Sequence, residues 1–174
     1  MKTTNYPVSL KENIHKILYG SNLEKEKFKG QFFYIADTPK FMKKLGLSGD
    51  YFSVKYGVIS RHFGKDREHN LSEDNWNELC NKITKPFAIS KYGKGYRLFI
   101  SIQSNNSFIA VGVDVKNIGK SLEVNSVKTV FTYNQRQNGK EDVIFRAKEI
   151  TPDQAALLDG LNSLSLPPDQ GQKC

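Results

Sequence analysis

Cysteine is scarce in this chain of 174 residues, which contains only Cys80 and Cys174. Two cysteines so far apart in the sequence predict neither a disulfide framework nor a zinc site. Cys80 falls on the apolar face of an expected helix, where we predict a buried structural thiol. Cys174 is the last residue and has no prenylation motif around it. A reducing compartment, the cytoplasm, is therefore the expected location.

Long hydrophobic runs are also missing, and none approaches the roughly 20 residues that a membrane-spanning helix needs. Residues 1–16, MKTTNYPVSLKENIHK, lack the apolar block of a secretory signal peptide. We therefore expect no membrane among the partners of this chain. Delivery by a phage virion or a secretion system would leave no such mark in the sequence, so that route stays open.

The sequence contains no phosphate-binding loop, dinucleotide fingerprint or HExxH metal motif. The acidic residues Asp66, Glu68, Glu73 and Asp74 are neighbours in sequence rather than a converging pair of carboxylates. We therefore expect no cofactor and no metal ligands.

Positive charge, by contrast, is abundant, with a formal net charge of +8 and a pI of about 9.4. Such an excess favours polyanionic partners, RNA among them, through counterion release and electrostatic steering. The basic residues lie in the body of the chain, whereas the segment from Glu149 onward is mildly acidic. This distribution predicts a basic surface on the folded domain rather than a basic tail.

Short helices and strands are expected to alternate in the first half of the chain. Apolar residues at helical spacing predict helices around residues 10–18, after Pro39, around residues 58–63 and after Ser72. A linker rich in lysine and glutamate is expected to follow the first helix. The aromatic stretches Gln31–Ala36 and Tyr51–Val54 predict two short strands.

The second half changes to a period of two, with turn-forming clusters such as Gly93-Lys94-Gly95 between successive runs. Because a parallel crossover needs a dozen residues or more, these short connections predict antiparallel pairing. The four expected strands are Phe87–Lys91, Tyr96–Gln103, Phe108–Lys116 and Val124–Tyr133.

The expected fold is therefore α+β, with N-terminal helices packed on a four-stranded antiparallel β-meander and a C-terminal helix that starts near Thr151. The expected divisions are an N-terminal helix and linker (1–30), a central domain (31–138), and a C-terminal helix and tail (139–174).

Two of the three histidines stand among basic residues in Tyr56–Asn70, YGVISRHFGKDREHN. Cleaving RNA through its 2′-hydroxyl needs a base, an acid and cations around the phosphorus atom. His62 and His69 are candidates for proton transfer, since histidine titrates near neutral pH. Arg61 and Lys55 are candidates for the cations. The acidic residues beside these cations equally fit an ordinary solvated turn.

The last expected strand, VNSVKTVFTYNQR, mixes hydroxyl groups with positive charge. Ser126, Lys128 and Tyr133 are candidate substrate-binding residues, and Thr129 shares a face with Phe131 and Tyr133. Hydroxyl groups on a sheet can hold a phosphate, and aromatic rings can stack on a base. Threonine and tyrosine are also good strand formers, so a purely structural role fits the same residues.

The order of these motifs resembles the phage-associated branch of the Barnase–EndoU–colicin–RelE (BECR) nuclease superfamily. This branch also occurs as the C-terminal domain of phage MuF-type proteins. The likeness covers residues 31–138 and rests on FYIADTPKFMKKLGL, the helix with the basic-histidine pair, KITKPFAIS and VNSVKTVFTYN.

The resemblance implies a metal-independent endoribonuclease that serves as a toxin or effector in conflicts of phages and mobile elements. It implies RNA, tRNA included, as the substrate and an immunity or antitoxin protein as a partner. Arg61 and His62 match the basic-histidine pair of the family, and His69 matches its second histidine. Thr129 matches its hydroxyl residue, with Ser126 as the other candidate for that place.

Two departures from the family pattern keep a second interpretation open. Phe131 stands where such strands often carry tyrosine, and Arg61 replaces the commoner lysine. The alternative is a non-catalytic nucleic-acid or partner-binding module on the same fold, and a structural accessory of a phage or mobile element comes third. The nuclease hypothesis requires His62 and His69 to face strand 124–133 across a shared cleft.

Overall fold

The computed structural model describes residues 7–62, 71–102, 107–118, 120–133 and 141–163. These residues form six helices and one eight-stranded mixed sheet. In spatial order, the strands are β1 (Val8–Ser9), β2 (Phe32–Asp37), β3 (Tyr51–Lys55), β7 (Leu122–Tyr133), β6 (Ser107–Ile118), β5 (Gly95–Ile102), β4 (Ala88–Tyr92) and β8 (Asp142–Arg146).

The expected fold, N-terminal helices on a four-stranded antiparallel meander, is wrong. Strands β4 to β7 do pair antiparallel, and the turn between β4 and β5 is the expected hairpin. However, β3 joins β7 in parallel, and β2 and β1 extend the sheet beyond it. Strand β8 pairs with β4 at the other edge. Short connections reveal pairing between neighbours in sequence, but not the pairing of β3 with a strand far along the chain.

The helices are α1 (Leu10–Tyr19), α2 (Asn22–Phe28), α3 (Lys40–Lys44), α4 (Tyr56–Arg61), α5 (Glu73–Lys82) and α6 (Pro152–Ser163). Serine side chains cap α1, α2 and α5 by accepting hydrogen bonds from backbone N–H groups of the first turn. Helix α2 lies in the expected linker and buries none of its residues. Cys80 on α5 is buried as predicted, and burial raises the pKa of its thiol to about 12.

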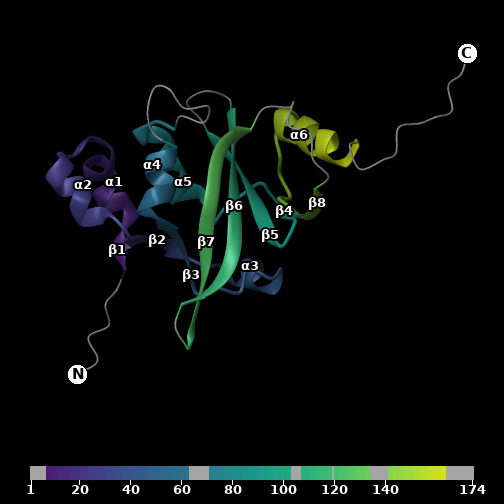
Figure 1. Cartoon of the computed structure of the whole chain (residues 1–174). Helices are drawn as coiled ribbons and strands as arrows, with labels where there is room; N and C mark the ends of the chain where they lie inside the picture. Colours follow the sequence, from purple (N-terminus) through teal and green to yellow (C-terminus); the bar gives the residue numbers. More distant parts are fainter. Residues whose placement is uncertain (1–6, 63–70, 103–106, 119, 134–140, 164–174) are drawn as a thin grey trace, which may run out of the picture.

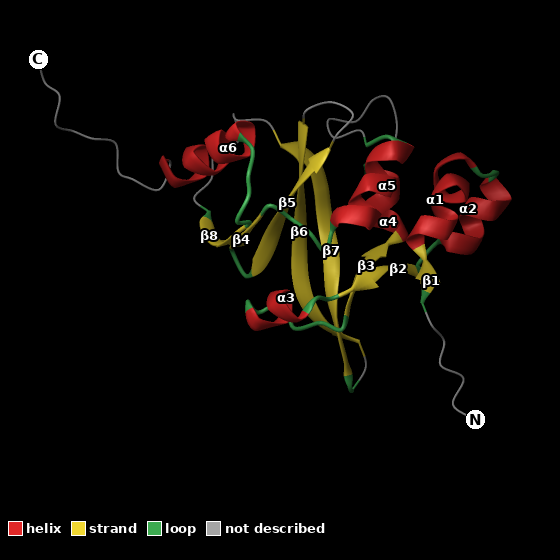
Figure 2. Cartoon of the chain, turned by 180° about the vertical axis from the view of Figure 1, so that it is seen from behind, coloured by secondary structure: helices red, strands yellow, loops and turns green. Residues whose placement is uncertain are grey.

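The two faces of the sheet differ in their cover. Helices α1, α4 and α5 pack on one face, here called the helical face, and contribute Leu10, Ile59 and Trp76 to the larger core. Figure 2 shows these helices in front of the strands. On the opposite face, here called the open face, α6 packs over Phe99 and Ala110 near β5. Figure 1 shows β6 and β7 in front, with no described helix before them.

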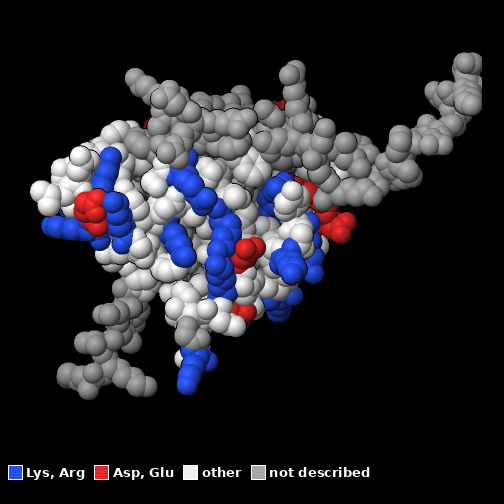
Figure 3. All heavy atoms as spheres, in the orientation of Figure 1, with Lys and Arg blue, Asp and Glu red and all other residues white. Residues whose placement is uncertain are grey.

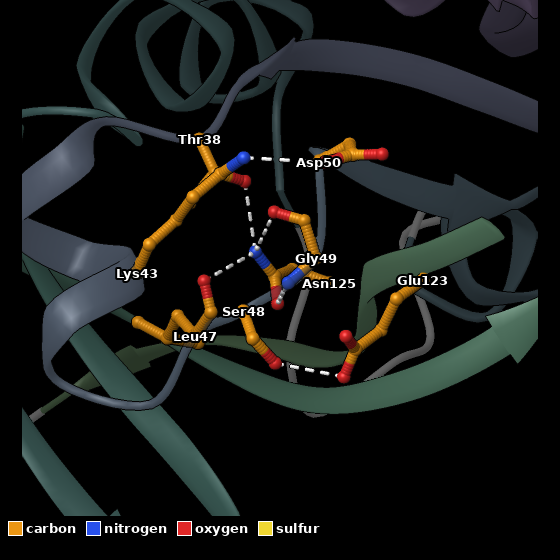
Figure 4. A network of polar contacts seen from close by, with 8 residues as sticks. All are labelled: Thr38, Lys43, Leu47, Ser48, Gly49, Asp50, Glu123 and Asn125. Carbon is orange, nitrogen blue, oxygen red and sulfur yellow. Dashed lines mark hydrogen bonds and ion pairs between the residues drawn. The ribbon is translucent and has the colours of Figure 1, made fainter. Parts of the chain in front are cut away.

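The segment between β2 and β3 is fastened to β7 by the buried side chain of Asn125, on the helical face (Figure 4). Asn125 Nδ2 donates to Thr38 Oγ1 at 2.8 Å and to the carbonyl oxygens of Gly49 and Leu47 at 3.2 and 3.3 Å. Asn125 Oδ1 accepts from the Gly49 N–H at 3.1 Å. A Cβ atom at Gly49 would collide with the β7 backbone, so the absence of a side chain permits this close approach.

Candidate functional site

Strand alternation places hydroxyl and ammonium groups side by side on the open face of β3 and β7. Ser53 pairs with Ser126, and Val54 pairs with Val127, in a parallel register. Both valines belong to the core on the helical face. Because successive side chains of a strand point to opposite faces, the two serines point to the open face, as does Lys55.

A β-bulge in β7 adds two more groups to this face. Gly112 pairs with Thr129 and Val113 pairs with Val127, which leaves Lys128 as the extra residue. A Cβ atom at Gly112 would collide with Thr129 Oγ1, so this hydroxyl lies over the backbone of β6. Bulges often occur next to active sites, where they redirect a side chain.

Three lysines, Lys55, Lys116 and Lys128, come together here and are called the lysine cluster below. Burial, followed by the neighbouring ammonium group of Lys116, lowers the pKa of Lys128 to about 8. Lys55 lowers this pKa by a smaller amount, and Asp114 opposes the effect. Figure 3 shows basic atoms in a column over the position of β6 and β7. Ammonium groups that repel one another in this way favour the binding of an anion.

Two hydroxyl groups beside the lysine cluster are buried without a partner. Ser53 and Ser126 are 0% and 1% exposed, and neither Oγ has a hydrogen-bond partner among the described residues. The indole N–H of Trp76, in the core of the helical face, is likewise buried without a hydrogen-bond partner among the described residues. A buried polar group without a partner costs about 1–3 kcal/mol. The two serines concentrate this cost at one paired position of the sheet.

Aromatic side chains lie along β2 and β3 next to the lysine cluster. The Lys55 ammonium group sits 4.9 Å from the centroid of the Phe32 ring. The Tyr34 and Tyr51 rings are 5.5 Å apart, and burial raises the pKa of both phenols. Phe32, Tyr34 and Tyr51 are partly exposed and belong to the open face by register. Partly exposed rings beside cations are suited to stacking on nucleic-acid bases.

The open face also carries a buried carboxylate, that of Glu141, whose partners are other residues of the chain. Arg97 forms an ion pair with buried Glu141, whose other carboxylate oxygen accepts a hydrogen bond of 2.7 Å from Ser90. The Arg97 guanidinium carbon lies 4.0 Å from the Tyr92 ring centroid and 5.1 Å from that of Phe131. This cluster holds β4 and β5 to the chain that leads into β8, which indicates a structural role.

The structure thus brings together four residues that the sequence singled out: Lys55, Ser126, Lys128 and Thr129. Sequence reasoning missed Ser53, Asp114 and Lys116, along with the aromatic row. The alternation of Phe32 and Tyr34 with buried Phe33 and Ile35 was the available signal for an exposed aromatic face. Ser53 had no such signal, because its pairing with Ser126 joins distant parts of the chain.

The basic-histidine pair lies at the end of α4. Arg61 is exposed and its Nε donates to the Gly57 carbonyl oxygen at 3.3 Å. The His62 N–H donates to the Ile59 carbonyl oxygen at 3.1 Å, and its own carbonyl oxygen accepts from the Leu71 N–H at 2.9 Å.

Two predicted site residues fall partly or wholly outside the description. His69 lies outside the described residues. Tyr133 ends β7, but its side chain lies outside the description too. A cleft shared by both histidines and β7 therefore stays a prediction.

The described residues include no group of three or more histidine, cysteine, aspartate and glutamate side chains that could hold a metal ion. Among these residues, no helix is long and apolar enough to cross a membrane.

The open face thus presents a cation cluster, hydroxyl groups and aromatic rings on adjacent strands, all assigned from geometry. Comparisons of the chain with protein-family models, curated proteins and solved structures found no match.

Proposed function

We propose that this chain is a metal-independent endoribonuclease that binds RNA on the open face of its sheet. The observation that carries the proposal is the lysine cluster, which lies beside hydroxyl groups and in which burial and then the neighbouring Lys116 lower the pKa of Lys128. The motif resemblance to BECR nucleases supports the same function through its residues. It does not support it through the fold, because the observed sheet departs from the expected meander.

In this proposal the lysine cluster neutralises the phosphate backbone, and Phe32, Tyr34 and Tyr51 stack on unpaired bases. Thr129 orients the scissile phosphate by donating a hydrogen bond. The RNA 2′-hydroxyl attacks the adjacent phosphorus atom and loses its proton to a base, while an acid protonates the departing 5′-oxygen.

His62 and His69 are the proposed base and acid, and Arg61 is the proposed cation that stabilises the pentacoordinate phosphorus. Lys55 is the N-cap of α4, and His62 is its C-cap. A helix of six residues spans about 9 Å. Helix α4 also contacts both β3 and β7. The short helix therefore starts the histidine-bearing segment directly after Lys55, but α4 itself packs on the helical face, whereas the lysine cluster lies on the open face. A shared site requires the segment after α4 to reach the open face.

The experiment is RNA cleavage by the full chain in the presence of EDTA. We expect products with 2′,3′-cyclic phosphate ends, and His62→Ala is expected to lower the rate at least about 100-fold because general acid–base catalysis contributes that much. Lys94→Met is the matched control, since it removes an exposed lysine from the β4–β5 turn and keeps full activity. Intact RNA after prolonged incubation with the wild-type chain would contradict the nuclease proposal.

The proposed biological role is that of a toxin whose partner is an immunity or antitoxin protein. Growth arrest on induction in bacteria, relieved by His62→Ala, is the expected result. Normal growth while the wild-type protein accumulates would argue against this role.

The second candidate function is RNA binding without cleavage. It is favoured by the location of the lysine cluster and the aromatic row, because both sets of residues bind RNA without transferring a proton. RNA that is bound with a steep salt dependence but left intact would support this function.

A further inference from the structure

We propose that Ser53 and Ser126 form a phosphate-binding subsite, in which their two hydroxyl groups donate to the oxygens of one phosphate group between Lys55 and Lys128. The inference rests on the proposed function for its setting, since that phosphate would belong to the RNA backbone. It names the residues that hold a single phosphate, and it assigns a role to Ser53 for the first time.

The first support is geometric. Ser53 and Ser126 occupy directly paired positions of neighbouring parallel strands, which run about 4.8 Å apart. Lys55 follows Ser53 by two residues, about 6.6 Å along the strand and on the same face, and Lys128 follows Ser126 by two residues at the β-bulge. The two serines and the two lysines that follow them therefore come from one small area of the open face.

The second support is the state of the hydroxyl groups. Both are buried, and both lack a hydrogen-bond partner among the described residues. Buried polar groups in proteins are nearly always paired, so a pair of exceptions at one position needs an explanation. A phosphate would supply the missing acceptors.

The third support is the charge around the serines. Lys55 comes from β3, Lys128 from β7, and Lys116 from β6. Among the described residues, Asp114 on β6, which pairs with Ser126, is the acidic group that opposes their effect on Lys128. The lowered pKa of Lys128 reflects burial first and the neighbouring cations second, with Asp114 opposing them in part. A bound phosphate would offset the repulsion between these cations and so raise the pKa of Lys128 again. Because both hydroxyl groups are buried, side chains around them must move for a phosphate to enter. Lysine side chains are long and flexible, so those of the cluster can fold onto the ligand.

The test is direct binding of two probes to the full chain, inorganic phosphate and a fluorescein-labelled oligouridylate. We expect Ser53→Ala and Ser126→Ala each to weaken binding of both probes roughly tenfold, the amount that a charge-assisted hydrogen bond supplies. Neither variant should lower the midpoint of thermal unfolding, because each removes a buried hydroxyl group that has no partner.

Ser90→Ala is the matched control, since Ser90 is a buried serine of the open face whose hydroxyl donates to Glu141. It should lower the thermal midpoint and leave phosphate affinity unchanged. An NMR titration of the Lys128 ammonium group gives a second readout. Its pKa should rise from about 8 when phosphate is added, and this rise should be lost in the double variant Ser53→Ala/Ser126→Ala.

Full affinity in the double variant, or no binding of either probe by the wild-type chain, would overturn the subsite. The two probes separate its possible ligands, because binding of inorganic phosphate alone indicates a site for free or terminal phosphate. The experiments also distinguish failure of the subsite proposal from failure of the nuclease proposal. A double variant that cleaves RNA normally refutes the subsite alone, whereas serine-dependent binding without cleavage refutes the nuclease alone.

Discussion

Asn125 and Ser126 are neighbours on β7, but their side chains lie on opposite faces of the sheet and in opposite states. Every polar atom of the Asn125 side chain is paired, and its partners fasten the segment before β3 (Figure 4). The Ser126 hydroxyl is equally buried and has no partner among the described residues. A satisfied buried group serves stability, whereas the unpaired hydroxyl groups of Ser126 and its partner Ser53 need another explanation, for which we propose a ligand.

The largest effect is expected at the buried ion pair of the open face. Arg97→Met leaves the Glu141 carboxylate buried without its cation, which should lower the free energy of unfolding by about 3–5 kcal/mol. Urea denaturation measures this loss, and adding Glu141→Gln should recover part of it. This result would show that pairing, rather than the face of the sheet, separates structural groups from functional ones. A loss under about 1 kcal/mol would place the pair among weak surface contacts.

Asn125→Ala tests the contribution of the fully hydrogen-bonded Asn125 side chain to stability. The variant removes the partner of the Gly49 N–H and of two carbonyl oxygens, and it leaves a cavity. We expect the free energy of unfolding to fall by about 2–4 kcal/mol in urea denaturation. Ser48→Ala is the control, because it removes an exposed hydrogen bond of the same segment and should cost under about 0.5 kcal/mol. An equal loss of unfolding free energy in both variants would show that the buried hydrogen bonds of Asn125 contribute no more than an exposed one.

Lys128 predicts a dependence of stability on pH. Its pKa in the folded chain is lowered from 10.5 to about 8, so the unfolded chain binds more protons between these two values. The free energy of unfolding should therefore rise with pH across that window. Because the side chain is partly exposed, solvent screening limits the gain to about 1 kcal/mol. Urea denaturation at pH 7.5 and 10.5 should show this gain in the wild-type chain and not in Lys128→Met.

Ser126→Ala carries the smallest expected change in stability. It exchanges an unpaired hydroxyl for a methyl-sized side chain, so the free energy of unfolding should stay within about 0.5 kcal/mol of the wild-type value or rise. Urea denaturation beside Asn125→Ala sets the two neighbours against each other. A loss of more than about 1 kcal/mol would mean that Ser126 is as structural as Asn125.

Local patterns in the sequence predicted the elements better than their arrangement. Alternation and short turns identified β4 to β7, and helical spacing identified α1 and α5. Helix α2 buries no residue and therefore has no apolar periodicity, although Ser21 and Glu24 form a capping box that marks its start. The parallel pairing of β3 with β7 depends on contacts between distant segments, which periodicity does not encode.

The candidate site shows the same division. Ser126, Lys128 and Thr129 were identified because they share one strand with hydroxyl and basic character. Lys55 was chosen as a cation for the histidines, and the structure places it in the lysine cluster instead. Ser53 sits between Phe52 and Val54 in a short strand. Only its pairing with Ser126 on β7 identifies it as a candidate site residue. Catalysis by His62 and His69 stays a prediction.

The parallel contact between β3 and β7 also controls when the candidate site can exist. Strand β3 emerges early during synthesis, whereas β7 emerges only after α4, α5 and β4 to β6. Pairing between such distant segments forms late in folding. Until β7 is in place, Ser53 and Lys55 belong to an incomplete sheet without Ser126 and Lys128. A nascent or truncated chain would therefore lack the candidate site, which is complete only when β7 has joined β3.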